Sequence, residues 1–252
     1  MDSLGFNILD QMQWWVILMG MAAVFVGSVI QGSTGLGFGM VTAPILLIMN
    51  PVFVPGPLLV LAMLVSFLMV LREWKNIDIR ELSMALGGRI PGTILAAIAF
   101  SAIPFALYGI VFGVMILSAV LLSVTRWHVM STGRNLLIAG FASGFMGTLT
   151  SVGAPPMALA YQNQTAAVIR STLAAFFTIG SLISIVTLVY YGGFSTDHIF
   201  ISAVFIPPLL LGFRLSSHLV KRLNIRAVRL SMLSISGFSA VILIIRSLFA
   251  LT

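Results

Sequence analysis

The sequence predicts an all-α polytopic membrane protein. Of its 252 residues, 60% are hydrophobic and only 8% are charged, whereas a soluble domain carries roughly 25% charged residues. No charged residue lies between Asp10 and Arg72, or between Arg89 and Arg126, and a membrane span needs about 20 apolar residues. The few Lys and Arg residues gather in short segments between the apolar runs. Because so few charges cannot cover a water-facing surface, we expect the chain to be embedded in a lipid bilayer.

We expect about eight membrane-spanning helices, within a range of six to ten. The runs 36–49 and 153–162 are too short to span comfortably, so we expect them to be arms of two broken or re-entrant glycine-rich helical hairpins. The predicted apolar runs are 14–30, 36–49, 56–72, 82–101, 104–124, 135–150, 153–162, 168–191, 198–217 and 231–250.

The distribution of basic residues predicts the orientation. Lys and Arg concentrate in the segments 72–81, 125–135 and 214–229, which should therefore be cytoplasmic loops. The N-terminus is acidic and segment 192–197 holds only Asp197, so both are predicted to face outside, on the periplasmic side. The second half starts inside and ends outside, so the C-terminus is predicted outside as well. A topology with ten full crossings and a topology with two re-entrant pairs account for this charge distribution equally well. The net charge of +7 thus reflects membrane orientation, and we expect no nucleic-acid partner.

The chain divides into two predicted repeats, 1–130 and 131–252. A shift of 112 residues superimposes Gly32 on Gly144, Gly35 on Gly147 and Pro44 on Pro156. Under the predicted orientation, the first half starts outside and ends inside, and the second half does the reverse. This is the pattern of an inverted-topology repeat.

Each half contains a glycine-rich stretch, within 27–44 and within 140–156. The segments "QGSTGLGFG" (31–39) and "GTLTSVGAP" (147–155) are the expected helix breaks. Irregular backbone at membrane depth survives only inside protein or beside a water-filled cavity, and paired breaks in matching positions indicate a transporter binding site. The exposed amides of broken helices favour an anion. The alternative is close helix packing through the G-x-x-x-G pairs, which are Gly35–Gly39, Gly88–Gly92, Gly109–Gly113 and Gly140–Gly144.

Hydroxyl, amide and arginine side chains supply the candidate site. Arg170 is the only charge between Arg134 and Asp197, and its planar guanidinium suits a pair of oxyanion oxygens. Arg89 and Arg214 are predicted gate or electrostatic residues; the alternative is that they snorkel to the headgroups as cytoplasmic anchors. The predicted substrate-binding residues are Gln31, Gly32, Ser33, Thr34, Gly35, Gly37, Thr148, Thr150, Ser151, Gly153, Asn163 and Arg170.

Several kinds of chemistry are excluded by the residues that are missing. The chain has no cysteine, so thiolate metal sites and cysteine nucleophiles are absent. No carboxylate or histidine falls in the middle of a predicted span. We therefore expect no metal, no cofactor and no enzymatic activity, and an anion rather than a metal cation as substrate.

Four segments resemble the TauE/SafE family of membrane permeases, also called the sulfite exporter family. They are "GSVIQGSTGLGFGMVTAP", "GFASGFMGTLTSVGAPP", "RSTLAAFFTIGSLIS" and "IPPLLLGFRLSSHLVKRL", and the resemblance covers nearly the whole chain. It implies a bacterial inner-membrane protein that exports small anions such as sulfite or organosulfonates. The first stretch departs from the commoner form, close to "GxGGG", because Leu36 and Phe38 interrupt the glycines. The substrate itself is therefore left open.

We therefore expect a transporter that exports a small sulfur-containing anion, such as sulfite or a sulfoacetate-like organosulfonate. Substrate would bind between the two glycine-rich stretches and reach each side by alternating access. The alternatives are an anion channel and a structural or accessory subunit of a membrane complex, in which the glycines would serve packing alone. The expected partners are the anion and the lipid bilayer, and a homodimer is left open.

Overall fold

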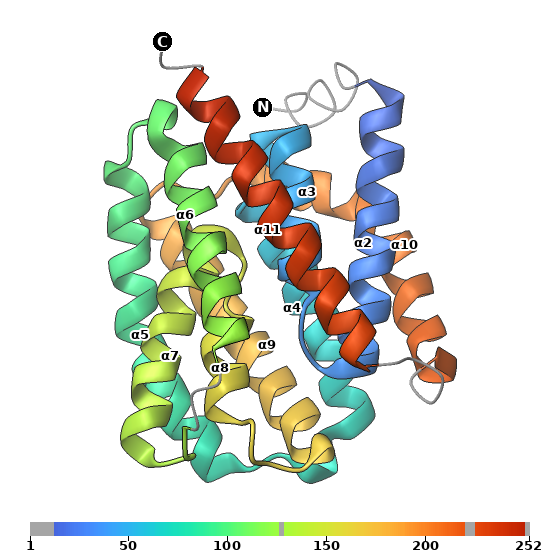
Figure 1. Cartoon of the computed structure of the whole chain (residues 1–252), viewed down its shortest axis with the longest axis vertical. Helices are drawn as coiled ribbons and strands as arrows, with labels where there is room; N and C mark the ends of the chain where they lie inside the picture. The colour runs from blue at the N-terminus through green and yellow to red at the C-terminus, as the bar shows by residue number, and fades with distance from the viewer. Residues whose placement is uncertain (1–12, 126–128, 220–224, 250–252) are drawn as a thin grey trace.

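The computed structural model describes residues 13–125, 129–219 and 225–249, which form helices and connecting turns and contain no strand (Figure 1). Seven of the helices are long and apolar enough to cross a membrane. The predicted all-α polytopic fold class is confirmed, and the seven helices lie within the predicted range of six to ten. The helices are α2 Trp14–Thr34, α3 Phe38–Met49, α4 Gly56–Glu73, α5 Ile79–Ala102, α6 Phe105–Val124, α7 Gly133–Thr150, α8 Ala154–Ala160, α9 Ala166–Tyr190, α10 Thr196–Leu219 and α11 Ile225–Phe249, with 3₁₀ turns at Pro51–Phe53 and Trp74–Asn76.

The helices of the described residues form two series of five, α2–α6 and α7–α11, and in each series the second helix is the short one. The packing follows the same correspondence: α5 packs against α7 as α10 packs against α2, and α3 against α11 as α8 against α6. The pairs α4–α9 and α6–α11 join the two series. This arrangement is what two repeats would give, and the division between residues 130 and 131 stays a prediction.

The first helix of each series ends at a matching position. α2 ends at Thr34 and α7 at Thr150, an offset of 116 residues that also relates Pro91 to Pro207. The shift of 112 residues differs from this offset by four residues, about one helical turn. The shift of 112 residues still superimposes glycines, because glycines recur along the packing face of the helices. It places the two helix ends about one turn out of register.

The chain breaks where the glycine-rich stretches predict. Between α2 and α3, Gly35 and Gly37 have φ of 88° and 104°, a region in which glycine is unstrained. Between α7 and α8, Ser151 takes φ 59° and Gly153 precedes the first residue of α8. Each stretch therefore forms a helical hairpin, which we name the first hairpin (α2–α3) and the second hairpin (α7–α8).

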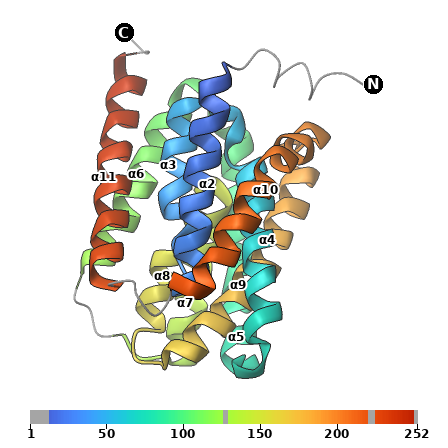
Figure 2. The ribbon, with the colours of Figure 1, turned by 90° about the vertical axis from the view of Figure 1, so that its right-hand side faces the viewer.

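The two short arms lie in opposite halves of the bundle, α3 in the upper half and α8 in the lower half of both views (Figures 1 and 2). The first residues of α2 and the last residues of α11 lie at the same end. We call this the outer end, and the opposite end, where α4 meets α5 and α9 begins, the inner end. Both names follow the predicted orientation, which stays a prediction.

Glycine pairs bring α5 and α7 into backbone contact. A Cβ atom on Gly88 would lie 1.9 Å from the Leu137 carbonyl oxygen, and one on Gly140 would lie 2.0 Å from the Ala85 oxygen. Their partners Gly92 and Gly144 make similar contacts, and Gly109 and Gly113 pack against α11. The packing interpretation is confirmed for these three pairs. The pair Gly35–Gly39 instead lies at the break of the first hairpin.

One sequence prediction needs correction, and one lies outside the described residues. The segment 214–229 is not a loop throughout, because α10 continues to Leu219. Arg214 lies on this helix, within the predicted apolar run 198–217. The acidic residues Asp2 and Asp10 lie outside the described residues.

Candidate functional site

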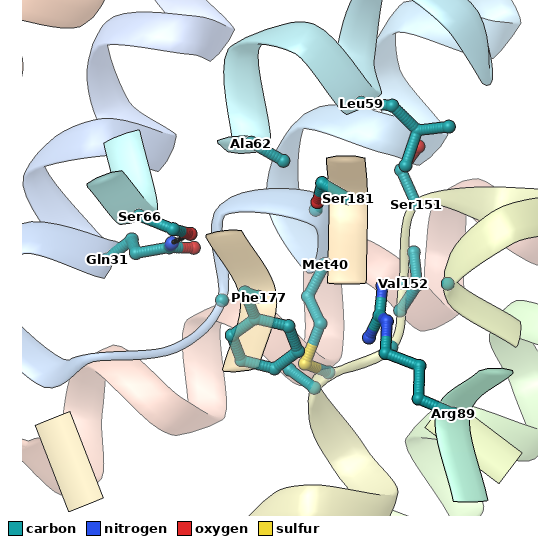
Figure 3. Close-up of a pocket in the computed structure, with 15 residues that line it drawn as sticks. Gln31, Met40, Leu59, Ala62, Ser66, Arg89, Ser151, Val152, Phe177 and Ser181 are labelled. Carbon is teal, nitrogen blue, oxygen red and sulfur yellow. Dashed lines mark hydrogen bonds between the residues drawn. The ribbon is translucent and has the colours of Figure 1, made fainter. Parts of the chain in front are cut away.

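The tips of the two hairpins meet at a small central cavity. A Cβ atom on Gly39, in the first turn of α3, would lie 1.9 Å from the carbonyl oxygen of Ser151, at the tip of the second hairpin. Both residues line a cavity of about 30 Å³, together with residues from α2, α4, α5 and α9 (Figure 3). That volume holds only one or two water molecules. The two glycine-rich stretches thus border the same small cavity.

Arg89 supplies the charge of this cavity. It lies near the middle of α5 and is 2% exposed. Figure 3 shows its guanidinium pointing into the group of labelled side chains, near Met40 and Val152. The snorkelling interpretation is wrong for Arg89, because its side chain is enclosed by protein rather than by lipid headgroups.

Glycines make the space that Arg89 occupies. A Cβ atom on Gly180 of α9 would lie 1.8 Å from its Nε atom and 2.2 Å from its Cζ atom, and Gly144 and Gly147 of α7 border it as well. The Cζ atom lies 4.8 Å from the ring centroid of Phe176. The guanidinium is therefore held between bare helix backbones and an aromatic ring.

Few polar groups satisfy this buried cation. One hydrogen bond, 3.4 Å long, runs from Nη1 to the Ser143 hydroxyl, and the buried Nε atom has no hydrogen-bond partner. Among the described residues, no carboxylate forms a salt bridge with Arg89. Burying a charge without a counter-charge is costly, so this cavity favours a negatively charged occupant.

The remaining polar groups come from α2, α4 and α9. Gln31 donates from Nε2 to the Ser66 hydroxyl at 2.8 Å, and its Oε1 atom accepts from the Phe38 amide at 3.2 Å. Gln31 thereby ties the start of α3 to α4. Ser66 and Ser181 also line the cavity, from the central pair of helices α4 and α9.

Four of the twelve predicted substrate-binding residues line the cavity: Gln31, Gly37, Ser151 and Gly153. Four predicted hydroxyl residues form hydrogen bonds outside the cavity: Ser33, Thr34, Thr148 and Thr150. Thr34 and Thr150 each accept from the amide two residues ahead, at 3.3 and 3.2 Å, and so brace the two helix breaks. Ser33 bonds the carbonyl oxygen of Val29, and Thr148 contacts the Ser184 hydroxyl at 2.8 Å.

The other predicted residues lie away from the cavity. A Cβ on Gly32 would strike Ser216 of α10, and Asn163 bonds the Val129 carbonyl oxygen from an exposed turn. Arg214 is exposed on α10 and does not line the cavity. Gly35 packs against Arg170, whose Cγ would lie 2.9 Å from an added Cβ.

Arg170 belongs to an ionic cluster at the inner end. Its Nε atom donates to both carboxylate oxygens of Glu73, at 3.0 and 2.8 Å. Arg72 lies 3.4 Å from the same carboxylate and donates to the Gly32 carbonyl oxygen in the first hairpin. The cluster, which we name the inner ionic cluster, therefore ties α4, α9 and the first hairpin together.

A larger cavity of about 230 Å³ lies toward the outer end, lined by Pro55, Tyr108 and His198 among others. Pro55 also contacts the central site, because its carbonyl oxygen accepts a 3.5 Å hydrogen bond from the Ser151 hydroxyl. This hydrogen bond links a residue that lines the outer cavity to one that lines the central cavity.

Replacing Gly180 with alanine is expected to push the Arg89 guanidinium out of place, because the added methyl group would overlap Nε and Cζ. We expect about 1–3 kcal/mol of destabilisation and about a tenfold loss of anion flux, measured in proteoliposomes. Gly87→Ala is the matched control, since its nearest contact is the flexible end of Leu137 at 3.3 Å. Equal flux in the two variants would contradict the prediction.

The family model described as "Sulfite exporter TauE/SafE" matches residues 19–243, almost the whole chain. The chain belongs to the TauE/SafE family. The predicted resemblance is confirmed, and membership implies a membrane transporter of sulfite-like anions. No curated protein and no solved structure matches the chain. In this TauE/SafE protein, sequence reasoning had not selected Ser66, Ser181 or Phe177. A signal exists for Ser66, which is the one polar residue in the apolar run 56–71.

Proposed function

We propose that this protein exports a small sulfur-containing oxyanion, such as sulfite or a sulfoacetate-like organosulfonate, through the central cavity. The observation that carries the proposal is Arg89, a fully buried guanidinium with no carboxylate partner among the described residues. A bound oxyanion would offset the cost of burying that charge. Its two oxygens also match the planar fork of an arginine.

The start of α3 is the second source of attraction. Gly37, Gly39 and Met40 line the cavity. Gly37, the N-cap residue of α3, has no side chain to cap the helix, and Gln31 accepts only from the Phe38 amide. The amides of a helix N-terminus favour negative charge. Ser66 and Ser181 add hydroxyl donors from α4 and α9. In this proposal Gln31 positions Ser66 and α3, because both ends of its amide are already engaged.

The size of the cavity supports a carrier that opens to one side at a time. About 30 Å³ is room for one or two water molecules, so the site must widen to hold a sulfite ion with its four heavy atoms. Closures on both sides, at Ser151–Pro55 and at Arg170–Glu73, favour alternating access over an open channel. We propose that the two inverted repeats, 1–130 and 131–252, move against each other around this site.

A flux assay in proteoliposomes tests the proposal. We would compare sulfite, sulfoacetate, taurine and sulfate, and expect saturable flux of at least one. Gln31→Ala should reduce that flux about 30-fold, because two hydrogen bonds of roughly 1 kcal/mol each are lost. Asn76→Ala, which removes an exposed amide at the inner end, should leave it unchanged. Folded wild-type protein without saturable flux of any of the four compounds would refute the proposal.

A further inference from the structure

The inner ionic cluster contains two cations for one anion. Arg72 comes from the end of α4 and Arg170 from the first turns of α9, and Glu73 lies between them. The three side chains are 26%, 27% and 17% exposed, so ions from the aqueous side can reach the cluster. The excess positive charge lies directly beside the tip of the first hairpin, where Arg170 packs on Gly35.

The Glu73 carboxylate occupies only some of the hydrogen-bond donors of the two arginines. It accepts from Arg170 through Nε, and no hydrogen bond of the Arg170 Nη atoms to a described residue is present. Arg72 reaches the carboxylate only at 3.4 Å, and its other partners are the neutral oxygens of Gly32, Ser216 and Ser217, with the last two at 3.2 Å. A carboxylate and a sulfite or sulfonate present the same kind of oxygen pair to a guanidinium.

The cluster also lies in line with the central cavity. Along α4, Ser66 precedes Glu73 by seven residues, and along α9, Arg170 precedes Phe177 by seven residues, which is about 10 Å of helix in each case. Ser66 and Phe177 line the central cavity. An anion that moves between the inner end and that cavity along the α4–α9 interface passes the two arginines.

We propose that Arg72 and Arg170 form a second binding site for a small oxyanion at the inner end of the path, and that Glu73 fills this site as a tethered competitor when the path is closed. This rests on the proposed function for the passage of the anion, while the binding itself is a separate property. Displacing Glu73 from Arg170 breaks the ion pair that joins α4 to α9 and loosens the first hairpin. Arrival of the anion and opening of the inner end are thereby coupled.

The competition sets the strength of binding. A tethered group acts at an effective concentration on the order of millimolar, so free anion must reach similar levels to displace Glu73. Replacing Glu73 with glutamine removes the competing charge and leaves both arginines in place. The apparent Kd for a small oxyanion at this site should therefore fall about tenfold.

Thermal unfolding of the purified full-length protein, titrated with sulfite against sodium chloride of equal ionic strength, measures this binding without any transport. Arg89→Gln removes the charge of the central site, so titrations in that background report the inner site. We expect Glu73→Gln/Arg89→Gln to bind sulfite about tenfold more tightly than Arg89→Gln alone. Adding Arg170→Gln should abolish the gain.

The matched control is Asp197→Asn in the same background, which removes a carboxylate at the outer end and should not change the apparent Kd. Should Glu73→Gln fail to fold, Glu73→Asp keeps the charge but retracts it by one methylene, and the apparent Kd should fall about threefold. If the inner ionic cluster only stabilises the fold and binds no anion, Glu73→Gln should lower the thermal stability without tightening sulfite binding. That result would overturn the inference. Absence of wild-type flux would instead count against the proposed function.

Discussion

Arg89→Gln is expected to abolish anion flux in a protein that remains folded. Glutamine keeps hydrogen-bonding groups in the cavity but removes the charge that the proposed anion pairs with. Truncating one member of a buried charge pair costs about 2–5 kcal/mol, which corresponds to roughly a 30- to 4,000-fold loss of flux. Initial rates of sulfite flux in proteoliposomes, at equal protein density, measure the loss.

The stability of this variant should move in the opposite direction. In the protein without substrate, Arg89 is buried, its Nε atom lacks a partner, and no described carboxylate forms a salt bridge with it. Removing such a charge relieves a desolvation penalty, so the Tm of Arg89→Gln should equal or exceed that of the wild type. A strongly destabilised variant would mean that Arg89 holds the bundle together, and the anion-site interpretation would lose its main support.

Arg134→Gln provides the matched control, because Arg134 is an exposed arginine on α7. We expect its flux to stay within about twofold of wild type, since surface charges contribute little. Arg89→Lys should retain the charge but lose the planar fork, and its flux should lie between those of wild type and Arg89→Gln. Equal losses in Arg134→Gln and Arg89→Gln would indicate a nonspecific effect of net charge.

The depth of Arg89 could have been read more fully from the sequence. It follows Glu81 by eight residues, about 12 Å along a helix, so the side chain begins more than two turns inside the predicted span. The positive-inside rule describes arginines at span ends, and Arg89 lies too far from a span end for the rule to hold. What the sequence could not supply is Gly180, ninety-one residues away, which leaves the space that the guanidinium fills.

The hydroxyls illustrate a different limit. The sequence located both helix breaks, because glycine at positive φ and the surrounding apolar runs are local signals. It could not tell which neighbours of a break face the cavity. Thr34 and Thr150 turn back to bond the backbone of their own hairpins, while Ser66 and Ser181 reach the cavity from other helices. Such choices depend on packing between distant segments rather than on local pattern.

Gly39→Ala is expected to have the largest effect on the architecture of the site. An added Cβ would lie 1.9 Å from the Ser151 carbonyl oxygen and 2.9 Å from its carbonyl carbon. Both are backbone atoms, so no side-chain rotation relieves the overlap, and the tips of the two hairpins must separate. We expect about 3 kcal/mol of destabilisation, a fall in Tm of roughly 10 °C, and flux below detection.

Gly237→Ala is the control for the general effect of adding a methyl group to a helix of this protein, because its nearest neighbour would be Val120 at 3.9 Å. That variant should match or slightly exceed wild-type stability, since alanine favours helix over glycine by about 1 kcal/mol. If Gly39→Ala instead retained wild-type Tm and flux, the close crossing of the tips would not exist in the working protein. The central cavity, which depends on that crossing, could then not be the anion site, and the arginines of the inner ionic cluster would become the first place to look for it.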